Sequence, residues 1–206
     1  HGSPLIVAKG NEKEEVLFSS SDAPLIGLAS SVVYLEDGVG GIASAESIEF
    51  FNDNYSWSSL PTSKQFAQKD GYRFFMEKEI YEQSTVVSDC MLGRIKDNEI
   101  LFDEIEKSII DGINEIKLCA CGTSYHAGLT ASYLFERRSK VKCNVEIASE
   151  FRYKEPLLTK DTLFIVISQS GETADTLEAL KMAKNAGLKT LVVCNVDNSS
   201  MTRTAD

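Results

Sequence analysis

Two short clusters of hydroxyl side chains and glycine are the part of this sequence best suited to chemistry. The first is Gly122-Thr123-Ser124, and the second is S-Q-S-G-E-T, whose polar side chains include Ser168, Gln169, Ser170 and Thr173. Each cluster lies between an apolar run and a helical pattern. Unpaired N–H groups at a helix start, together with the positive end of the helix dipole, attract phosphate. We therefore predict that the two clusters cradle a phosphate group.

Other interpretations explain the two clusters less well. Ser and Thr are good helix N-caps, which would be enough to explain one cluster but not two, with three hydroxyls crowded into the second. A dinucleotide site needs G-x-G-x-x-G and an acid about 20 residues later, whereas the first junction offers only Gly122 and Gly128, with Glu146 near the position of the acid. The P-loop pattern G-x-x-x-x-G-K-[ST] is absent from the sequence.

The elements that would position these clusters alternate strictly between strand and helix. We expect strands at 116–121, 141–147, 163–168 and 190–195, with helices at 124–138 and 173–186, the second ended by Gly187. Continuous apolar strands separated by amphipathic helices predict an α/β domain with a doubly wound parallel sheet. Ligands bind such sheets beyond the carboxyl ends of the strands, where the strand order reverses, and the two clusters follow strands in this way.

The preceding part of the chain has a different pattern. Residues 1–60 are expected to be β-rich, with strands at 4–8, 15–18, 32–35 and 48–51 and one short helix capped at Ser21 or Asp22. The polar stretch 53–72 is typical of a linker. Helices are expected from Phe74 to a stop at Gly93, and over 101–110. We place the domain boundaries at 1–60, 61–72 and 73–206, and we expect both ends to be cut, because the chain begins at His1 and stops in a polar stretch.

Composition excludes several classes of partner. Lys and Arg total 21 against 31 Asp and Glu, a formal charge of −10, so nucleic acid is not expected to bind. No apolar run approaches the ~20 residues of a membrane helix, and no signal peptide opens the sequence, which favours a cytoplasmic protein with no membrane partner. The five cysteines lack disulfide-framework or zinc spacing, so we expect reduced thiols, no metal and no cofactor.

Four longer motifs carry a family resemblance: CGTSYHAG (121–128), VEIASEFRY (145–153), SQSGETADTLEAL (168–180) and CNVDNSS (194–200). In this order and spacing they resemble the glutamine:fructose-6-phosphate aminotransferases. The segment FMEKEIYEQ (75–83) is similar to the family segment that opens the isomerase part, although Ser84 stands where the family usually has Pro. Residues 1–60 resemble the end of an Ntn-type glutaminase domain, and 73–206 resemble a truncated first sugar-isomerase (SIS) subdomain, a flavodoxin-like fold.

The resemblance implies a function and a set of ligands. It implies part of an enzyme that makes glucosamine 6-phosphate from fructose 6-phosphate and glutamine, pairs as a homodimer and meets glutamine only through the missing glutaminase part. The matching hexose-phosphate ligands are Thr123, Ser124, Ser168, Gln169, Ser170 and Thr173. The family's catalytic residues have no counterpart here, so we expect this chain alone to bind sugar phosphate without turnover.

Two further hypotheses stay open alongside the enzyme. One is a non-catalytic SIS module that senses a sugar phosphate, and the other is a nicotinamide-binding domain, which the glycine spacing disfavours. The roles of two residues near the clusters are also open. Glu172 is expected to support a helix dipole, and His126 to be a partly exposed helix residue, with ring opening of the sugar as its alternative role.

Overall fold

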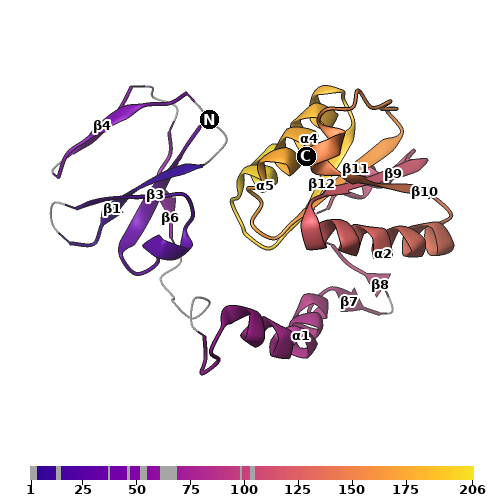
Figure 1. Cartoon of the computed structure of the whole chain (residues 1–206), viewed down its shortest axis with the longest axis horizontal. Coiled ribbons are helices and arrows are strands. Elements are labelled where there is room, and N and C mark those ends of the chain that lie inside the picture. Colours follow the sequence, from indigo (N-terminus) through magenta and orange to yellow (C-terminus); the bar gives the residue numbers. More distant parts are fainter. Residues whose placement is uncertain are drawn as a thin grey trace. The chain divides into compact units, whose positions relative to one another are not determined.

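The computed structural model describes residues 4–12, 15–36, 38–45, 47–51, 55–60, 69–97, 99–102 and 105–206. The chain divides into two compact units, one within residues 3–105 and the other within residues 106–206 (Figure 1). The first unit contains the β-rich part and a long helix. The second contains both hydroxyl clusters.

The first unit is built on an antiparallel sheet of order β2-β1-β3-β6. Its strands are β1 (Leu5–Gly10), β2 (Val16–Ser19), β3 (Ala29–Leu35) and β6 (Ser58–Ser59), and a separate hairpin pairs β4 (Gly41–Ala43) with β5 (Ile48–Phe50). Apolar side chains from one face of the sheet form a small core with Leu25 and Leu60. The four expected strands are therefore confirmed, while β4 and β6 were not predicted.

Two expected elements of the first part of the chain differ in the structure. The short helix after Asp22 is a single 3-10 turn, η1 (Ala23–Leu25), and Asp22 makes no side-chain cap. Within the polar stretch interpreted as a linker, Ser58 and Ser59 pair with β3, and Leu60 is buried in the core. Residues 53–54 and 61–68 of that stretch lie outside the described residues.

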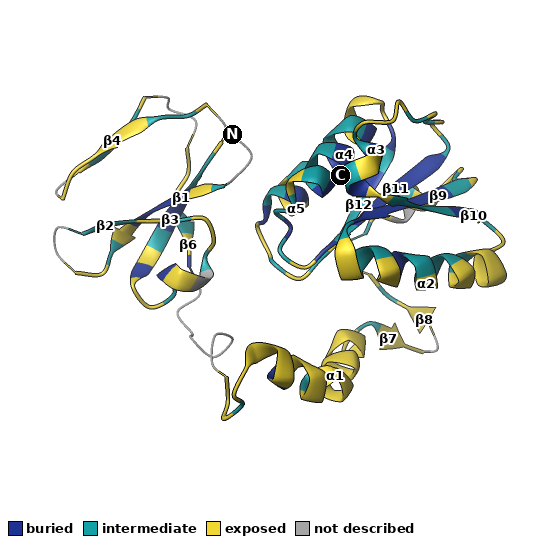
Figure 2. Ribbon diagram, in the orientation of Figure 1, coloured by how far each residue is buried: buried dark blue, intermediate teal, exposed yellow. Residues whose placement is uncertain are grey.

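The predicted helix after Phe74 is confirmed as α1 (Phe75–Met91), and Gly93 takes the left-handed conformation, with a φ of +74°, that ends many helices. Helix α1 is exposed over most of its length (Figure 2). A small hairpin of β7 (Ile95–Lys96) and β8 (Glu99–Ile100) follows it.

The helix expected over 101–110 is wrong. In the described part of this stretch, residues 101–102 and 105–110, only a 3-10 turn, η3 (Lys107–Ile110), forms, and Glu106 before it has an extended backbone. Tertiary contacts explain the difference: Ile109 packs against the sheet of the second unit, and Lys189 donates to the carbonyls of Ser108 and Asp111 at 2.6 and 2.9 Å. These contacts hold a tight turn that leads directly into the first strand of that sheet.

The second unit is a parallel sheet of order β10-β9-β11-β12 with helices on both faces. Its strands are β9 (Glu115–Ala120), β10 (Lys142–Ile147), β11 (Thr162–Ser168) and β12 (Lys189–Cys194). Its helices are α2 (Gly122–Ser139), α3 (Ala148–Phe151), α4 (Ala174–Asn185) and α5 (Ser200–Thr204). The predicted doubly wound α/β fold is therefore confirmed, with α3 and α5 added.

Each face of this sheet has its own core, because successive side chains of a strand point to opposite faces. On one face Phe164 and Val166 of β11 pack with Phe151 of α3 and Leu180 of α4. On the other face Leu163 and Ile165 pack with residues of α2, such as Phe135. Figure 2 shows the buried residues running along the strands between the two helical layers.

Two cysteines of this unit are predicted to resist alkylation in the native state. Burial raises the pKa of the Cys119 thiol to about 12 and that of Cys143 to about 11, whereas Cys90 of α1 is exposed. Because iodoacetamide reacts with the thiolate, we expect peptide mass spectrometry at pH 8 to find Cys90 modified and both buried thiols unmodified until urea is added. Labelling of Cys119 as fast as Cys90 without urea would contradict this packing.

Among the described residues, no helix is both long enough and apolar enough to cross a bilayer.

Candidate phosphate-binding site

The two hydroxyl clusters follow neighbouring strands at the point where the strand order reverses. From β9 the chain passes through α2 to β10 on one side, whereas β11 pairs with β9 on the other side. Gly122, Thr123 and Ser124 open α2 directly after β9, and Ser168 is the last residue of β11. In open α/β sheets this switch point is where ligands bind.

A direct contact joins the two junctions. The hydroxyl of Thr176, in the first turn of α4, donates to the sulfur of Cys121, the residue before α2, at 3.8 Å. Thr176 is 1% exposed, so this contact is sheltered from water. The starts of α2 and α4 therefore lie close together at the carboxyl edge of the sheet.

The hydroxyl side chains do not cap either helix. The residue before α2 is Cys121 and the residue before α4 is Thr173, and neither makes a side-chain cap. Among the described residues, the structure gives no acceptor for the backbone N–H groups of Ser124 in α2 or of Ala174 and Asp175 in α4. Both helices thus present unpaired donors at the same edge, which is the arrangement that an anion requires.

Ser168 and Ser170 shape the loop between β11 and α4. The Ser168 hydroxyl accepts the N–H of Gly171 at 2.9 Å, and the Ser170 hydroxyl accepts the N–H of Glu172 at 3.2 Å. A hydroxyl has one donor beside its acceptor sites, and neither O–H donates to another residue of the described chain. Each serine therefore keeps a hydrogen available for a ligand.

The predicted site residues differ in exposure. Gly122, Thr123 and Gln169 are exposed, Ser124, Ser170 and Thr173 are partly buried, and Ser168 is buried. Gly122 has a φ of +58°, the left-handed region that favours glycine. The predicted site therefore combines exposed side chains, which a ligand can reach from solvent, with the buried hydroxyl of Ser168 at the end of β11.

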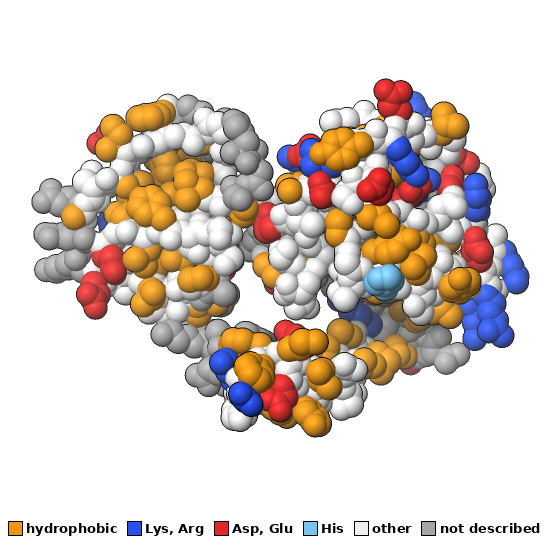
Figure 3. All heavy atoms as spheres, viewed as in Figure 1, with side chains coloured by type: hydrophobic (Ala, Val, Ile, Leu, Met, Phe, Trp, Pro, Cys, Tyr) orange, Lys and Arg blue, Asp and Glu red, His pale blue; other side chains and the backbone are white. Residues whose placement is uncertain are grey.

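The charged residues in the first turns of α2 and α4 do not oppose the binding of an anion there. The first turn of α2 carries no acidic residue, and its basic residues, Arg137 and Arg138, lie in the last turn, where basic side chains gather on the surface (Figure 3). In the first turn of α4, Asp175 is paired with Arg152 at 2.7 Å. The positive ends of both helices are therefore free of unpaired carboxylates from their own first turns.

Sequence reasoning missed a third loop at this edge. Gly171 has a φ of +69°, and its carbonyl accepts the N–H of Met201 in α5 at 3.1 Å. The carboxylate of Glu172 accepts the N–H of Ser200 at 2.7 Å, so it contacts the start of α5. The sequence did not predict this contact with a segment far along the chain, and the dipole role of Glu172 stays a prediction. The motif CNVDNSS marked this segment, although only through the family resemblance.

His126 lies in α2 and is exposed, as expected, with its ring 5.5 Å from the ring of Tyr125. In the part of the chain that the structure describes, no group of three His, Cys, Asp or Glu side chains could hold a metal ion.

Comparison with known proteins agrees with this architecture. Residues 109–206 match the family model described as SIS domain. The whole chain is 55% identical to part of a glutamine–fructose-6-phosphate aminotransferase (isomerizing) of Campylobacter jejuni, and 99% of it is 43% identical to part of the protein of that name from Helicobacter pylori. The matches span 35% and 34% of those relatives, so the chain spans about a third of their length.

A solved structure gives the same result for the fold. The C-terminal domain of glucosamine-fructose-6-phosphate aminotransferase from Francisella tularensis superposes with a TM-score of 0.63 at 48% identity, covering 68% of this chain and 40% of that one. Residues 109–206 therefore match a SIS domain, and the chain is homologous, over its whole length, to about one third of a glutamine–fructose-6-phosphate aminotransferase.

Proposed function

We propose that the loops after β9 and β11 bind the phosphate of a hexose 6-phosphate, either fructose 6-phosphate or glucosamine 6-phosphate. The observation that carries the proposal is the convergence of two uncapped helix starts at the switch point of the sheet, joined by the contact between Thr176 and Cys121. The proposed donors are the side chains of Thr123, Ser124, Ser168, Gln169, Ser170 and Thr173, with the backbone at Gly122 giving close approach.

This site suits a small dianion on an acidic protein. The net charge of −10 repels anions over long distances, but the donors of the site are N–H and O–H groups that act within hydrogen-bonding reach. Because each donor is fixed by the fold, the phosphate would be held in one orientation. The sugar attached to it would then be presented to residues supplied by other parts of the whole protein.

The printed names of the relatives suggest the larger function. We propose that the chain is part of an amidotransferase that makes glucosamine 6-phosphate from fructose 6-phosphate and glutamine. In this proposal residues 1–60 belong to the glutaminase part, 61–72 form a linker, and 73–206 belong to the first SIS subdomain. Glutamine would bind outside this chain, and two copies of the whole protein would pair as a dimer.

Truncating Ser170 to Ala is predicted to weaken binding of fructose 6-phosphate by ~1–2 kcal/mol, the cost of losing a hydrogen bond to a charged group. Isothermal calorimetry on this chain measures the affinity directly. The control is Ser132→Ala, because Ser132 lies further along α2 and its hydroxyl donates to the Leu129 carbonyl of the same helix at 2.8 Å. Equal affinities for the Ser170 variant and the unaltered chain would show that this serine only shapes the loop.

A chimera separates the enzyme from the alternative of a non-catalytic sensor. Replacing the matching third of the Campylobacter jejuni relative by this chain should give a protein that forms glucosamine 6-phosphate from fructose 6-phosphate and glutamine. Ser170→Ala in the chimera should raise the KM for fructose 6-phosphate. A folded chimera that binds the sugar phosphate without forming product would favour the sensor.

A further inference from the structure

The loop between β11 and α4 is held by the start of α5. The first N–H groups of a helix have no partner within that helix. In α5 the N–H of Ser200 goes to the Glu172 carboxylate at 2.7 Å, and the N–H of Met201 goes to the Gly171 carbonyl at 3.1 Å. The loop proposed to bind phosphate therefore supplies the acceptors that α5 lacks.

Ser199 completes this attachment from the other side. It is 3% exposed, and its hydroxyl accepts the N–H of Thr202 as the N-cap of α5. A Cβ placed on Gly171 would lie 2.0 Å from that hydroxyl, so the Gly171 backbone lies closer to the Ser199 side chain than a larger residue at position 171 would allow. Three contacts thus link two consecutive loop residues, Gly171 and Glu172, to three consecutive residues at the start of α5.

The contact between Glu172 and Ser200 also fixes the backbone of the loop that leads into α4, and with it the direction of its N–H groups. The N–H of Glu172 is held by the Ser170 hydroxyl, and its side chain is held by Ser200, so this residue is fixed at both ends. Thr173 and the first turn of α4 follow directly. A shift of Glu172 would therefore move the Ser170 hydroxyl and the free N–H groups of α4 together.

We propose that Glu172 is a positioning residue, which fixes the phosphate-binding loop by accepting the N–H of Ser200. This inference rests on the proposed function, and it assigns the carboxylate a role through the protein and not through the ligand. This role also explains the segment from Cys194 to Ser200, because the loop between β11 and α4 packs against it.

Comparing Glu172→Gln with Glu172→Ala tests the role of the contact. Gln keeps an oxygen that accepts the Ser200 N–H and loses the charge, whereas Ala loses both. If Glu172 acts by holding the loop, the Glu172→Gln variant should bind fructose 6-phosphate at least as tightly as the unaltered chain, because a negative charge near the phosphate has been removed. Ala should bind roughly tenfold more weakly, equivalent to ~1.4 kcal/mol. Equal weakening by Gln and Ala would mean that the charge matters and would overturn the proposal.

A double-mutant cycle tests the partner. Ser200→Pro removes the N–H donor at the first position of α5, where proline is tolerated, and Ser199 before it is already extended, with φ −66° and ψ 163°. Ser200→Pro alone should weaken binding as much as Glu172→Ala, and the double variant no more than either single one. Additive losses would show that the two residues act independently and would overturn the proposal.

Amide exchange separates failure of this inference from failure of the proposed function. Measured by NMR, the amide hydrogen of Ser200 should exchange slowly with solvent in the unaltered chain and in the Glu172→Gln variant, and fast in the Glu172→Ala variant. Absence of fructose 6-phosphate binding by the unaltered chain overturns the proposed function, while the Ser200 exchange rate still reports whether Glu172 holds the loop. Binding by the unaltered chain, with equal affinity in the Ala variant, overturns the positioning role alone.

Discussion

Gly171→Ala is expected to destabilise the second unit by about 3 kcal/mol and to lower its thermal midpoint by roughly 15 °C. The new Cβ would lie 2.0 Å from the Ser199 hydroxyl oxygen, 2.3 Å from the Ser199 Cβ and 2.8 Å from the Cys194 sulfur. The φ of +69° at position 171 adds a backbone cost of ~1–2 kcal/mol for any residue with a side chain. Relief requires Ser199 to move, which would also break the N-cap of α5. Thermal unfolding followed by circular dichroism measures the shift.

Gly187→Ala is the matched control for this prediction. Gly187 has a φ of +77° at the end of α4, and nothing lies within 4 Å of the position of its Cβ. Its substitution should therefore cost only the backbone term, ~1–2 kcal/mol. Adding Ser199→Gly to Gly171→Ala should restore part of the lost stability by removing the clash. If the Gly171 and Gly187 variants unfold at the same temperature, the close approach of Gly171 to Ser199 is wrong.

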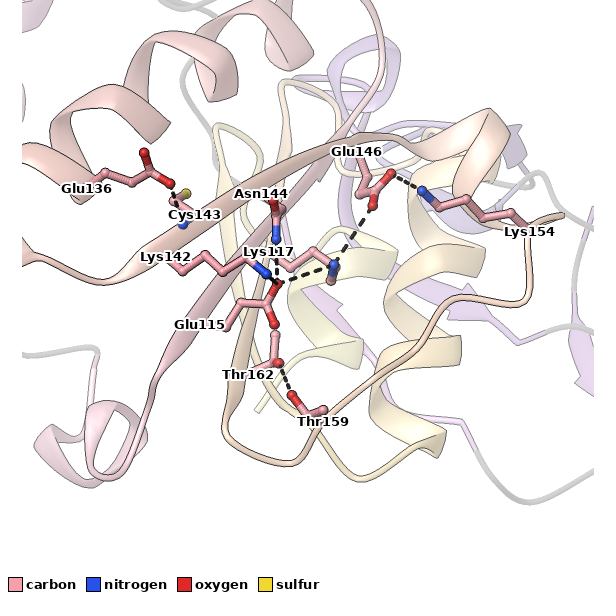
Figure 4. A network of polar contacts seen from close by, with 10 residues as sticks. All are labelled: Glu115, Lys117, Glu136, Lys142, Cys143, Asn144, Glu146, Lys154, Thr159 and Thr162. Atoms are coloured by element: carbon pink, nitrogen blue, oxygen red, sulfur yellow. Dashed lines mark hydrogen bonds and ion pairs between the residues drawn. The ribbon is translucent and has the colours of Figure 1, made fainter.

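The second large effect is expected at Lys117, which lies in the middle of β9 with only 9% of its side chain exposed. Its ammonium is 3.7 Å from Glu115 and 3.8 Å from Glu146 of the neighbouring strand (Figure 4). Lys117→Ala would leave the largely buried carboxylates of Glu115 and Glu146 with only the more exposed Lys142 and Lys154 as cationic partners among the described residues, and it would remove the packing of the lysine stem. We expect a loss of about 2 kcal/mol, measured by urea unfolding.

Lys142→Ala controls for the loss of a lysine in the same network. Lys142 also approaches Glu115, at 3.9 Å, but 68% of its side chain is exposed. Water screens such a pair, so we expect a change within about 0.5 kcal/mol. Equal destabilisation by the Lys117 and Lys142 variants would contradict the view that burial makes the Lys117 contacts important.

The sequence predicted the elements that repeat a clear pattern. The strand from Leu163 to Ser168 is a continuous apolar run, and α4 combines helical periodicity with the stop at Gly187, so both were placed within about two residues. The alternation of strand and helix predicted a parallel sheet, with the two hydroxyl clusters beyond the carboxyl ends of its strands. The order of the strands, which places the switch point between β9 and β11, came from the structure.

What the sequence could not predict depends on contacts between distant residues. Glu172 has the position of a dipole-supporting carboxylate, and only the fold brings Ser200 to it. Lys117 interrupts an apolar run, and its partner Glu146 on β10 is brought near by the strand register. The helix expected over 101–110 failed because the packing of Ile109 and the bonds from Lys189 outweigh local periodicity. Elements as short as α3 and α5 carry no measurable period.

The central claim is that the starts of α2 and α4 bind a hexose phosphate together. An NMR titration of the chain with glucosamine 6-phosphate tests it most directly, because each backbone N–H reports its own environment. We predict that the largest saturable shifts fall on the amides of Thr123, Ser124, Ser170, Thr173 and Ala174, with inorganic phosphate moving the same set at higher concentration. Saturable shifts confined to another part of the sheet, or shifts in only one of the two loops, would contradict the account.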